Sequence, residues 1–305
     1  MKPNEFYTTI KEHILEFLPQ EYNHAKVIVE EIVKPGDVKL HGLSIIKEND
    51  LFSPNIYLDE CYDMYMKGEN IKSILRIIAD TYLHEIKKPI MMEIPYCNKE
   101  WIKEKVLLQA IDKRTNQSYI DQYPHMELGC DYVAIPYITL NSTNYPAISR
   151  LTNDICEIID MTNDQLLKKA MENTQEKYPA VFGNMLNVLL DMESCFLNDN
   201  PVIDPRDPMF TITNEIAYMG AITLFYPGNL QKIGHLLSQN YYILPSSVHE
   251  MLIIPEKTAQ MTPDELSLMV QEVNIHKIPF KEQMGNRVMY YDRKNDELRI
   301  VADKN

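Results

Sequence analysis

The sequence has little glycine and none of the common glycine-rich motifs. Nine glycines in 305 residues leave little material for a loop that holds phosphate, and neither G-x-G-x-x-G nor G-x-x-x-x-G-K-[ST] occurs. The H-E-x-x-H pattern of zinc proteases and the G-x-S-x-G pattern of α/β-hydrolases are missing as well. These absences exclude the enzyme classes that the motifs define, and we expect no cofactor.

Cysteine is also scarce, and its positions are scattered. The five cysteines show no C-x-x-C pair and no spacing typical of zinc ligands; they are Cys61, Cys97, Cys130, Cys156 and Cys195. An odd number of separated thiols argues against a disulfide framework and is typical of a reducing compartment. We therefore expect a cytoplasmic protein without a metal site.

Long apolar runs and an excess of basic residues are absent too. No run of about 18 apolar residues occurs, and the first residues carry charges through their apolar positions, unlike a signal peptide. The formal net charge of −14 repels phosphate backbones, so we expect neither membrane nor nucleic-acid binding. Acidic residues alternate with Lys and Arg, which favours simple solubility, with an acidic face for a basic protein partner as the alternative.

What the sequence does contain is typical of a globular protein. Apolar residues make up 45% and charged residues 24%, and the length suits two domains or one large one. Helical and strand-like patterns follow one another without strict alternation. This order predicts an α+β protein with mixed or mainly antiparallel sheets packed against helices. The proline- and aspartate-rich stretch 198–208 predicts a boundary between modules 1–197 and 198–305, or a loop within one shared core.

Several local patterns predict individual elements. Pro35-Gly36-Asp37 is typical of a hairpin turn, and Thr162 and Thr262 each begin a capping box that opens a helix. The apolar segment Pro179–Met192 predicts another helix, and Ala221–Tyr226 predicts a strand.

One polar turn carries residue types that catalysis uses. Ser246, Ser247, His249 and Glu250 lie between two apolar strands, in the string LPSSVHE. A hydroxyl can act as nucleophile, an imidazole as general base and a carboxylate as its orienting partner. The alternative is structural, because Ser and His side chains often satisfy backbone groups in turns.

The same string carries a resemblance to a known family. LPSSVHE, followed by MVQEVN and preceded by SPNIYLDECYDMY and TNEIAYMGAITLFY, resembles an uncharacterised family of bacterial proteins known only as a domain of unknown function. The resemblance implies a bacterial cytoplasmic protein and no particular activity. It marks Pro245, Asn274 and the four residues of the polar turn as family-like, and we consider Pro245, Asn274 and His125 as candidate ligand-binding residues.

Two hypotheses from different classes follow. The first is a non-enzymatic protein-binding or regulatory module with a protein partner or a homo-oligomeric state. The chain lacks a recognised catalytic motif, and it contains 19 tyrosines and 17 methionines, which suit protein contacts. The second is a hydrolase-like enzyme acting on small molecules, with Ser246 or Ser247 as nucleophile, His249 as base and Glu250 as orienting group. We favour the binding module.

Overall fold

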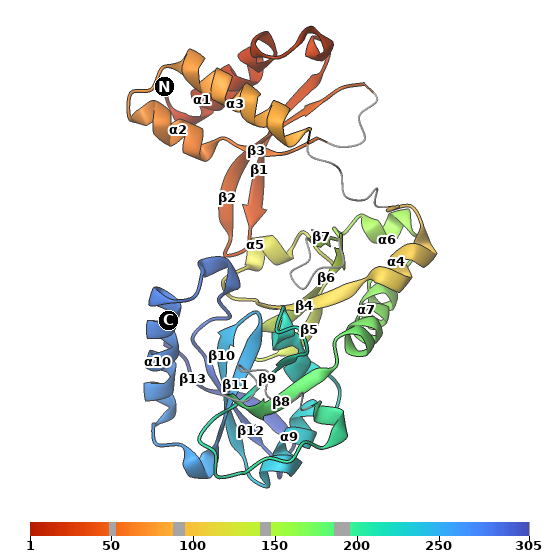
Figure 1. Ribbon diagram of the computed structural model, residues 1–305, viewed down its shortest axis with the longest axis vertical. Helices are drawn as coiled ribbons and strands as arrows, with labels where there is room; N and C mark the ends of the chain where they lie inside the picture. The colour runs from red at the N-terminus through yellow and green to blue at the C-terminus, as the bar shows by residue number, and fades with distance from the viewer. Residues whose placement is uncertain (49–52, 88–94, 141–147, 186–195, 305) are drawn as a thin grey trace. The chain divides into compact units, whose positions relative to one another are not determined.

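The chain divides into two compact units, Met1–Met91 and Met92–Asn305, here called unit 1 and unit 2 (Figure 1). The computed structural model describes residues 1–48, 53–87, 95–140, 148–185 and 196–304. The module boundary expected at 197/198 lies inside unit 2. Strands from both sides of it share one sheet, because β8 (Ala180–Asn184) pairs with β9 (Phe210–Asn214).

Unit 1 is a small antiparallel sheet with helices. Its strands, in the order β1-β2-β3, are β1 (Lys26–Lys34), β2 (Val38–Ile46) and β3 (Ile56–Tyr57), and its helices are α1 (Pro3–His13), η1 (Ile14–Phe17), η2 (Gln20–Tyr22), α2 (Asp59–Met66) and α3 (Ile71–Glu85). The predicted β1–β2 hairpin is confirmed, with Lys34 opposite Val38. Gly36 and Asp37 both have positive φ in its turn, a conformation that glycine and aspartate tolerate best.

Two antiparallel sheets form the frame of unit 2. The larger has the order β13-β12-β10-β11-β9-β8, and the smaller has the order β4-β6-β5 with β7 also paired to β6. Besides β8 and β9, the strands are β4 (Leu107–Asp112), β5 (Met126–Gly129), β6 (Tyr132–Thr139), β7 (Ile148–Arg150), β10 (Tyr241–Ser247), β11 (Glu250–Pro255), β12 (Val288–Asp292) and β13 (Glu297–Ala302). All strand pairs in the described residues are antiparallel, so the predicted α+β class is confirmed.

Helices pack against both sheets of unit 2. They are α4 (Lys99–Lys105), α5 (Gln117–Ile120), α6 (Ile155–Ile158), α7 (Asn163–Lys177), α9 (Asn229–Leu237) and α10 (Pro263–His276), with the 3-10 turns η3 (Leu197–Asp199), η4 (Gly220–Phe225), η5 (Glu256–Thr258) and η6 (Phe280–Glu282). Both predicted capping boxes are confirmed, at Thr162 for α7 and at Thr262 for α10. Asn173 of α7 donates to the Lys103 and Val106 carbonyls at the end of α4, which fixes the two helices together.

One predicted element was wrong, and another was wrong over its first residues. The described part of the predicted helix Pro179–Met192 begins with strand β8, and residues 186–192 lie outside the described residues. The predicted strand Ala221–Tyr226 is mainly the 3-10 turn η4. Strand β8 and the turn η4 are short, mostly buried apolar runs, in which helix and strand cannot be distinguished by periodicity.

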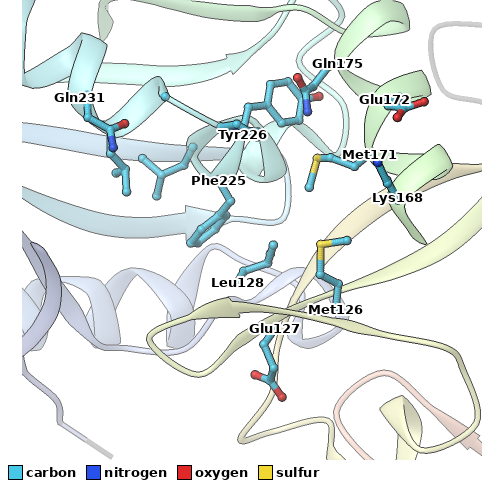
Figure 2. Close-up of a pocket in the computed structure, with 14 residues that line it drawn as sticks. Met126, Glu127, Leu128, Lys168, Met171, Glu172, Gln175, Phe225, Tyr226 and Gln231 are labelled. Carbon is cyan, nitrogen blue, oxygen red and sulfur yellow. The ribbon is translucent and has the colours of Figure 1, made fainter. Parts of the chain in front are cut away.

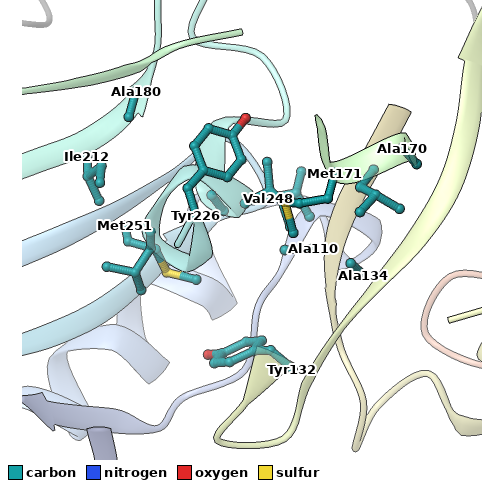
Figure 3. Packing of buried hydrophobic residues seen from close by; sticks show 14 of the residues in the cluster. Ala110, Tyr132, Ala134, Ala170, Met171, Ala180, Ile212, Tyr226, Val248 and Met251 are labelled. Carbon is teal, nitrogen blue, oxygen red and sulfur yellow. The ribbon is translucent and has the colours of Figure 1, made fainter. Parts of the chain in front are cut away.

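The turn η4 lies inside the main core of unit 2. It contacts β8, β9 and β11 of the larger sheet and β4 of the smaller one, and Gly220 through Leu224 are all buried. Gly220 permits this position, because a Cβ atom there would lie 2.5 Å from the His249 carbonyl oxygen. Figure 3 shows the surrounding apolar side chains, including Met171 of α7, Tyr132 of β6 and Met251 of β11.

A buried ion pair connects the two sheets of unit 2. Arg287, just before β12, donates to Asp112 at the end of β4 over 2.6 Å, and both side chains are almost fully buried. The guanidinium lies 4.4 Å from the centre of the Tyr132 ring. Burying two charges is favourable only when they pair closely, so this contact holds one relative arrangement of the sheets.

Candidate functional site

The polar turn predicted from LPSSVHE connects β10 to β11. The hairpin register shifts between Pro245 and Ser247, so the strand is irregular where the turn begins. Pro245 is buried opposite Met251, and Ser247 is buried as well. Ser246 and Ser247 end β10 and Glu250 begins β11, so only Val248 and His249 form the turn that was predicted to hold all of these polar residues.

Hydrogen bonds join the polar groups of this turn differently from a Ser–His–Glu relay. The Ser246 hydroxyl donates to the Glu250 carboxylate at 2.7 Å. The Ser247 hydroxyl accepts from the His249 backbone N–H at 3.1 Å. Each serine thus has a partner other than the imidazole, and Glu250 contacts a serine.

The His249 ring is held by residues far away in the sequence. Its Nδ1 accepts the Met219 backbone N–H at 3.1 Å, and its Nε2 lies 3.6 Å from the Glu282 carboxylate. The Tyr218 ring lies beside it, with centroids 5.4 Å apart. Only a neutral imidazole can accept at Nδ1, so the ring serves here as an acceptor for the loop that leads into η4.

That loop has a constrained backbone. Ala217 and Met219 both have positive φ, a region that costs L-residues about 1–2 kcal/mol. Asn214 closes the loop through its side chain, which accepts from the Tyr218 N–H and donates to the Tyr218 carbonyl. His249 and Asn214 together hold a conformation that the loop would not adopt by itself.

The other two predicted residues lie apart from this turn. Asn274 of α10 is buried; it donates to the Gly285 carbonyl and accepts at its own carbonyl from Gln283, so it holds the segment that leads to Arg287. His125 is exposed, and its Nδ1 lies 3.1 Å from the Tyr123 carbonyl oxygen. Neither contact brings these residues to His249.

A different feature of unit 2 has the form of a binding site. A hollow of about 540 Å³ lies between β5, α7, η4 and the start of α9. The apolar side chains that line it are Met126, Leu128, Met171, Leu224, Phe225 and Leu230. In Figure 2, Met126, Leu128, Met171 and Phe225 gather around one space, and Glu127 points away from it.

Local structure explains why this floor is apolar. Met126 and Leu128 lie two residues apart on β5, so both face the same side of the strand. The Phe225 ring contacts the Tyr132 ring, with centroids 5.6 Å apart. The Tyr226 hydroxyl donates to the Thr174 carbonyl, and burial raises the pKa of this phenol. The lining of the hollow therefore combines flexible methionine side chains with aromatic rings held in place by packing and hydrogen bonds inside unit 2.

Positive charge lies at one edge of the hollow. Lys168 of α7 lines it and also lines a neighbouring hollow of about 350 Å³ with Lys99, Lys103 and Lys169, and Glu172 lines both hollows. Lys103 pairs with Glu100, and Lys169 lies 3.5 Å from Glu172. Lys168 is exposed and makes no ion pair with any residue that the structure describes. An acidic protein thus presents an unpaired cation beside an apolar floor.

The residues of this hollow were not identified from the sequence. They come from four separated segments, and no motif connects them. The abundance of methionine was the only signal, and it does not indicate which methionines gather.

The described residues contain no group of three or more His, Cys, Asp or Glu side chains placed to hold a metal ion. No helix among them is both long and apolar enough to cross a membrane.

The fold and the hollow define an α+β protein with an open apolar site in its larger unit. The chain belongs to the family of unknown function DUF5688, which matches it over residues 3–293. The resemblance noted from the sequence to a family of unknown function is thereby confirmed. No curated protein and no solved structure matches the chain.

Proposed function

We propose that the protein is a non-enzymatic binding module and that the hollow of unit 2 receives a segment of a protein partner. The observation that carries this proposal is the apolar floor around Met126, Met171 and Phe225 with Lys168 unpaired at its edge. Protein interfaces combine an apolar centre with a polar rim, and they are enriched in aromatic residues and methionine. Methionine also adapts its shape to different bound side chains.

The charge at the rim indicates what the segment carries. A bulky apolar side chain of the partner packs against the apolar lining of the hollow, and a carboxylate on the same partner segment pairs with Lys168. A volume of about 540 Å³ lies within the range of about 300–1,000 Å³ that is common for ligand sites. An amphipathic helix with Asp or Glu beside its apolar face meets both requirements.

The enzymatic alternative has less support. A Ser246 or Ser247 nucleophile needs His249 within reach of its hydroxyl, whereas the imidazole contacts Met219, Glu282 and the ring of Tyr218. We also propose a cytoplasmic location in a bacterium. It is supported by the sequence resemblance and by the free thiols of Cys61, Cys97, Cys130 and Cys156.

The test uses a panel of synthetic helical peptides of 15 residues. Each has leucines on one face, and the flanking positions are either all Glu or all Lys. Fluorescence anisotropy should show micromolar binding of the Glu-flanked peptides to the full chain, with much weaker binding of the Lys-flanked ones. Leu128→Asp places a charge in the apolar floor and should abolish binding.

Charge reversal at the rim completes the test. Lys168→Glu should weaken the Glu-flanked peptides by roughly three- to tenfold, because an exposed ion pair contributes about 0.2–1 kcal/mol and the reversal adds repulsion. The matched control is Lys72→Glu, an exposed lysine of α3 in unit 1, which should leave affinity unchanged. Absence of binding by every peptide would refute the proposed function.

A further inference from the structure

Helix α10 exposes an apolar and acidic stripe. Its inner face, with Leu266, Val270 and Asn274, is buried. On its outer face Leu268 is 50% and Ile275 is 69% exposed. These two residues are seven positions apart, so they lie on one side of the helix, two turns from each other.

Carboxylates accompany these apolar residues. Asp264 lies one turn before Leu268, and Glu272 lies one turn after it. Glu272 is exposed and forms no ion pair within the described part of the chain. The stripe thus alternates carboxylate and apolar groups along the outer face of α10.

The stripe and the hollow are complementary in both polarity and charge. The hollow offers an apolar floor beside Lys168. Two carboxylates, Glu127 and Glu172, also line it, and they lie within ion-pair distance of Lys113 and Lys169. The stripe offers leucine and isoleucine beside Glu272. The unpaired cation of one surface matches the unpaired carboxylate of the other.

One copy of the chain cannot join these two surfaces of unit 2 by itself. The inner face of α10 contacts β10, β12 and β13, so its outer face points away from the sheet. The hollow is lined by β5, α7, η4 and α9, and α7 and α10 lie on opposite sides of unit 2 (Figure 1). The complementary surface must therefore belong to another molecule.

We infer that the partner is a second copy of this chain, whose helix α10 enters the hollow of the first. The inference rests on the proposed function of the hollow. The contact joins two different surfaces, so it is heterologous, and each bound copy still presents one free hollow and one free α10. Association therefore grows head to tail as the protein concentration rises.

Sedimentation velocity of the full chain, from about 1 to 300 μM, tests the inference. The parent should show a weight-average sedimentation coefficient that rises with concentration. Ile275→Asp places a charge in the α10 contact and should sediment as a monomer throughout. Lys168→Glu weakens the hollow and should move the rise to roughly three- to tenfold higher concentration. Both positions are exposed, and circular dichroism checks that each variant is folded.

Mixing the two variants gives the sharper result. Ile275→Asp keeps its hollow and Lys168→Glu keeps its α10, so at a concentration where Lys168→Glu alone is a monomer an equimolar mixture should form a dimer and nothing larger. The double variant Lys168→Glu/Glu272→Lys should again associate as the concentration rises, because the two charges are exchanged and can still pair. The matched control Ile77→Asp, at an exposed apolar position of α3 in unit 1, should associate like the parent.

The outcomes separate this inference from the proposed function. A parent chain that stays monomeric at all concentrations overturns the inference, even if the hollow binds the Glu-flanked peptides. The inference is also overturned if neither Ile275→Asp nor Lys168→Glu reduces the rise of the sedimentation coefficient with concentration. It is overturned as well if a mixture of the two variants stays monomeric.

Discussion

Replacement of His249 by alanine tests whether the LPSSVHE turn is structural. The imidazole accepts the Met219 N–H at 3.1 Å, and Met219 is 7% exposed. Removal of the ring leaves this donor buried without its acceptor, which costs about 1–3 kcal/mol. The loop can relax its positive φ angles once released, which offsets part of the loss. We therefore expect His249→Ala to lower the free energy of unfolding by about 2 kcal/mol.

Urea titration followed by tryptophan fluorescence measures this loss. The only tryptophan, Trp101, belongs to α4 in unit 2, so its signal reports the unit that contains His249. With an m-value of about 2–3 kcal/mol/M, a loss of about 2 kcal/mol moves the midpoint down by about 0.7–1 M. Ser246→Ala is the control. Its side chain is partly exposed and its hydroxyl donates to Glu250, so we expect a loss of about 0.5 kcal/mol.

The opposite result would return the turn to consideration as an active site. Residues kept for chemistry are often held at some expense of stability, so an unchanged or raised midpoint for His249→Ala would refute the structural role. Nitrogen NMR gives an independent check. Because Nδ1 accepts from Met219, the neutral ring should carry its proton on Nε2, which faces Glu282. Observation of the other tautomer would contradict this geometry.

Three further predictions concern stability and ionisation. Arg287→Met leaves Asp112 as an unpaired carboxylate that is 1% exposed, so unfolding free energy should fall by about 3–5 kcal/mol in the same urea titration; a loss below 1 kcal/mol would contradict the role of the ion pair. Partial burial raises the pKa of the Asp59 carboxyl, but hydrogen bonds from the backbone N–H and the imidazole of His41 in β2 lower it. The net pKa of Asp59 lies below its ordinary value. The stabilisation is therefore present above that ordinary value and is lost as pH falls through the lower folded pKa; the carboxyl ¹³C shift should titrate below 3.8, and a midpoint at or above 3.8 would contradict the pairing. Gly220→Ala places a Cβ atom 2.5 Å from the His249 carbonyl oxygen and should cost at least about 1–3 kcal/mol, whereas an unchanged urea midpoint would show that η4 can shift.

Local sequence patterns were sufficient for much of the fold. The β1–β2 hairpin follows from Pro35-Gly36-Asp37, and the starts of α7 and α10 follow from their capping boxes. These features depend on residues within a few positions of each other. The segments predicted wrongly, Ala180–Asn184 and Ala221–Tyr226, are apolar runs whose conformation is decided by strand partners and core packing elsewhere in the chain.

The site could not be predicted in the same way, because its contacts join distant residues. His249 meets Met219, 30 positions away, and Glu282, 33 positions away. The ion pair of Arg287 spans 175 positions. The hollow combines β5, α7, η4 and α9, and each contributes one or two ordinary apolar residues. A single sequence contains no local signal for such a set.

The comparison of the two regions shows why residue type alone did not locate the function. Ser246, Ser247 and His249 have the chemistry of catalysis, yet their hydrogen-bonding groups are directed to partners within the turn and to the loop before η4. Lys168 is an ordinary surface residue by type, yet it lacks a partner in the described chain and stands beside an apolar floor. A polar group that is already satisfied contributes stability, whereas an unpaired charge next to uncovered apolar surface gains free energy only when another molecule binds. The hollow is therefore the proposed interaction surface, and the contacts of the turn support a structural role for it.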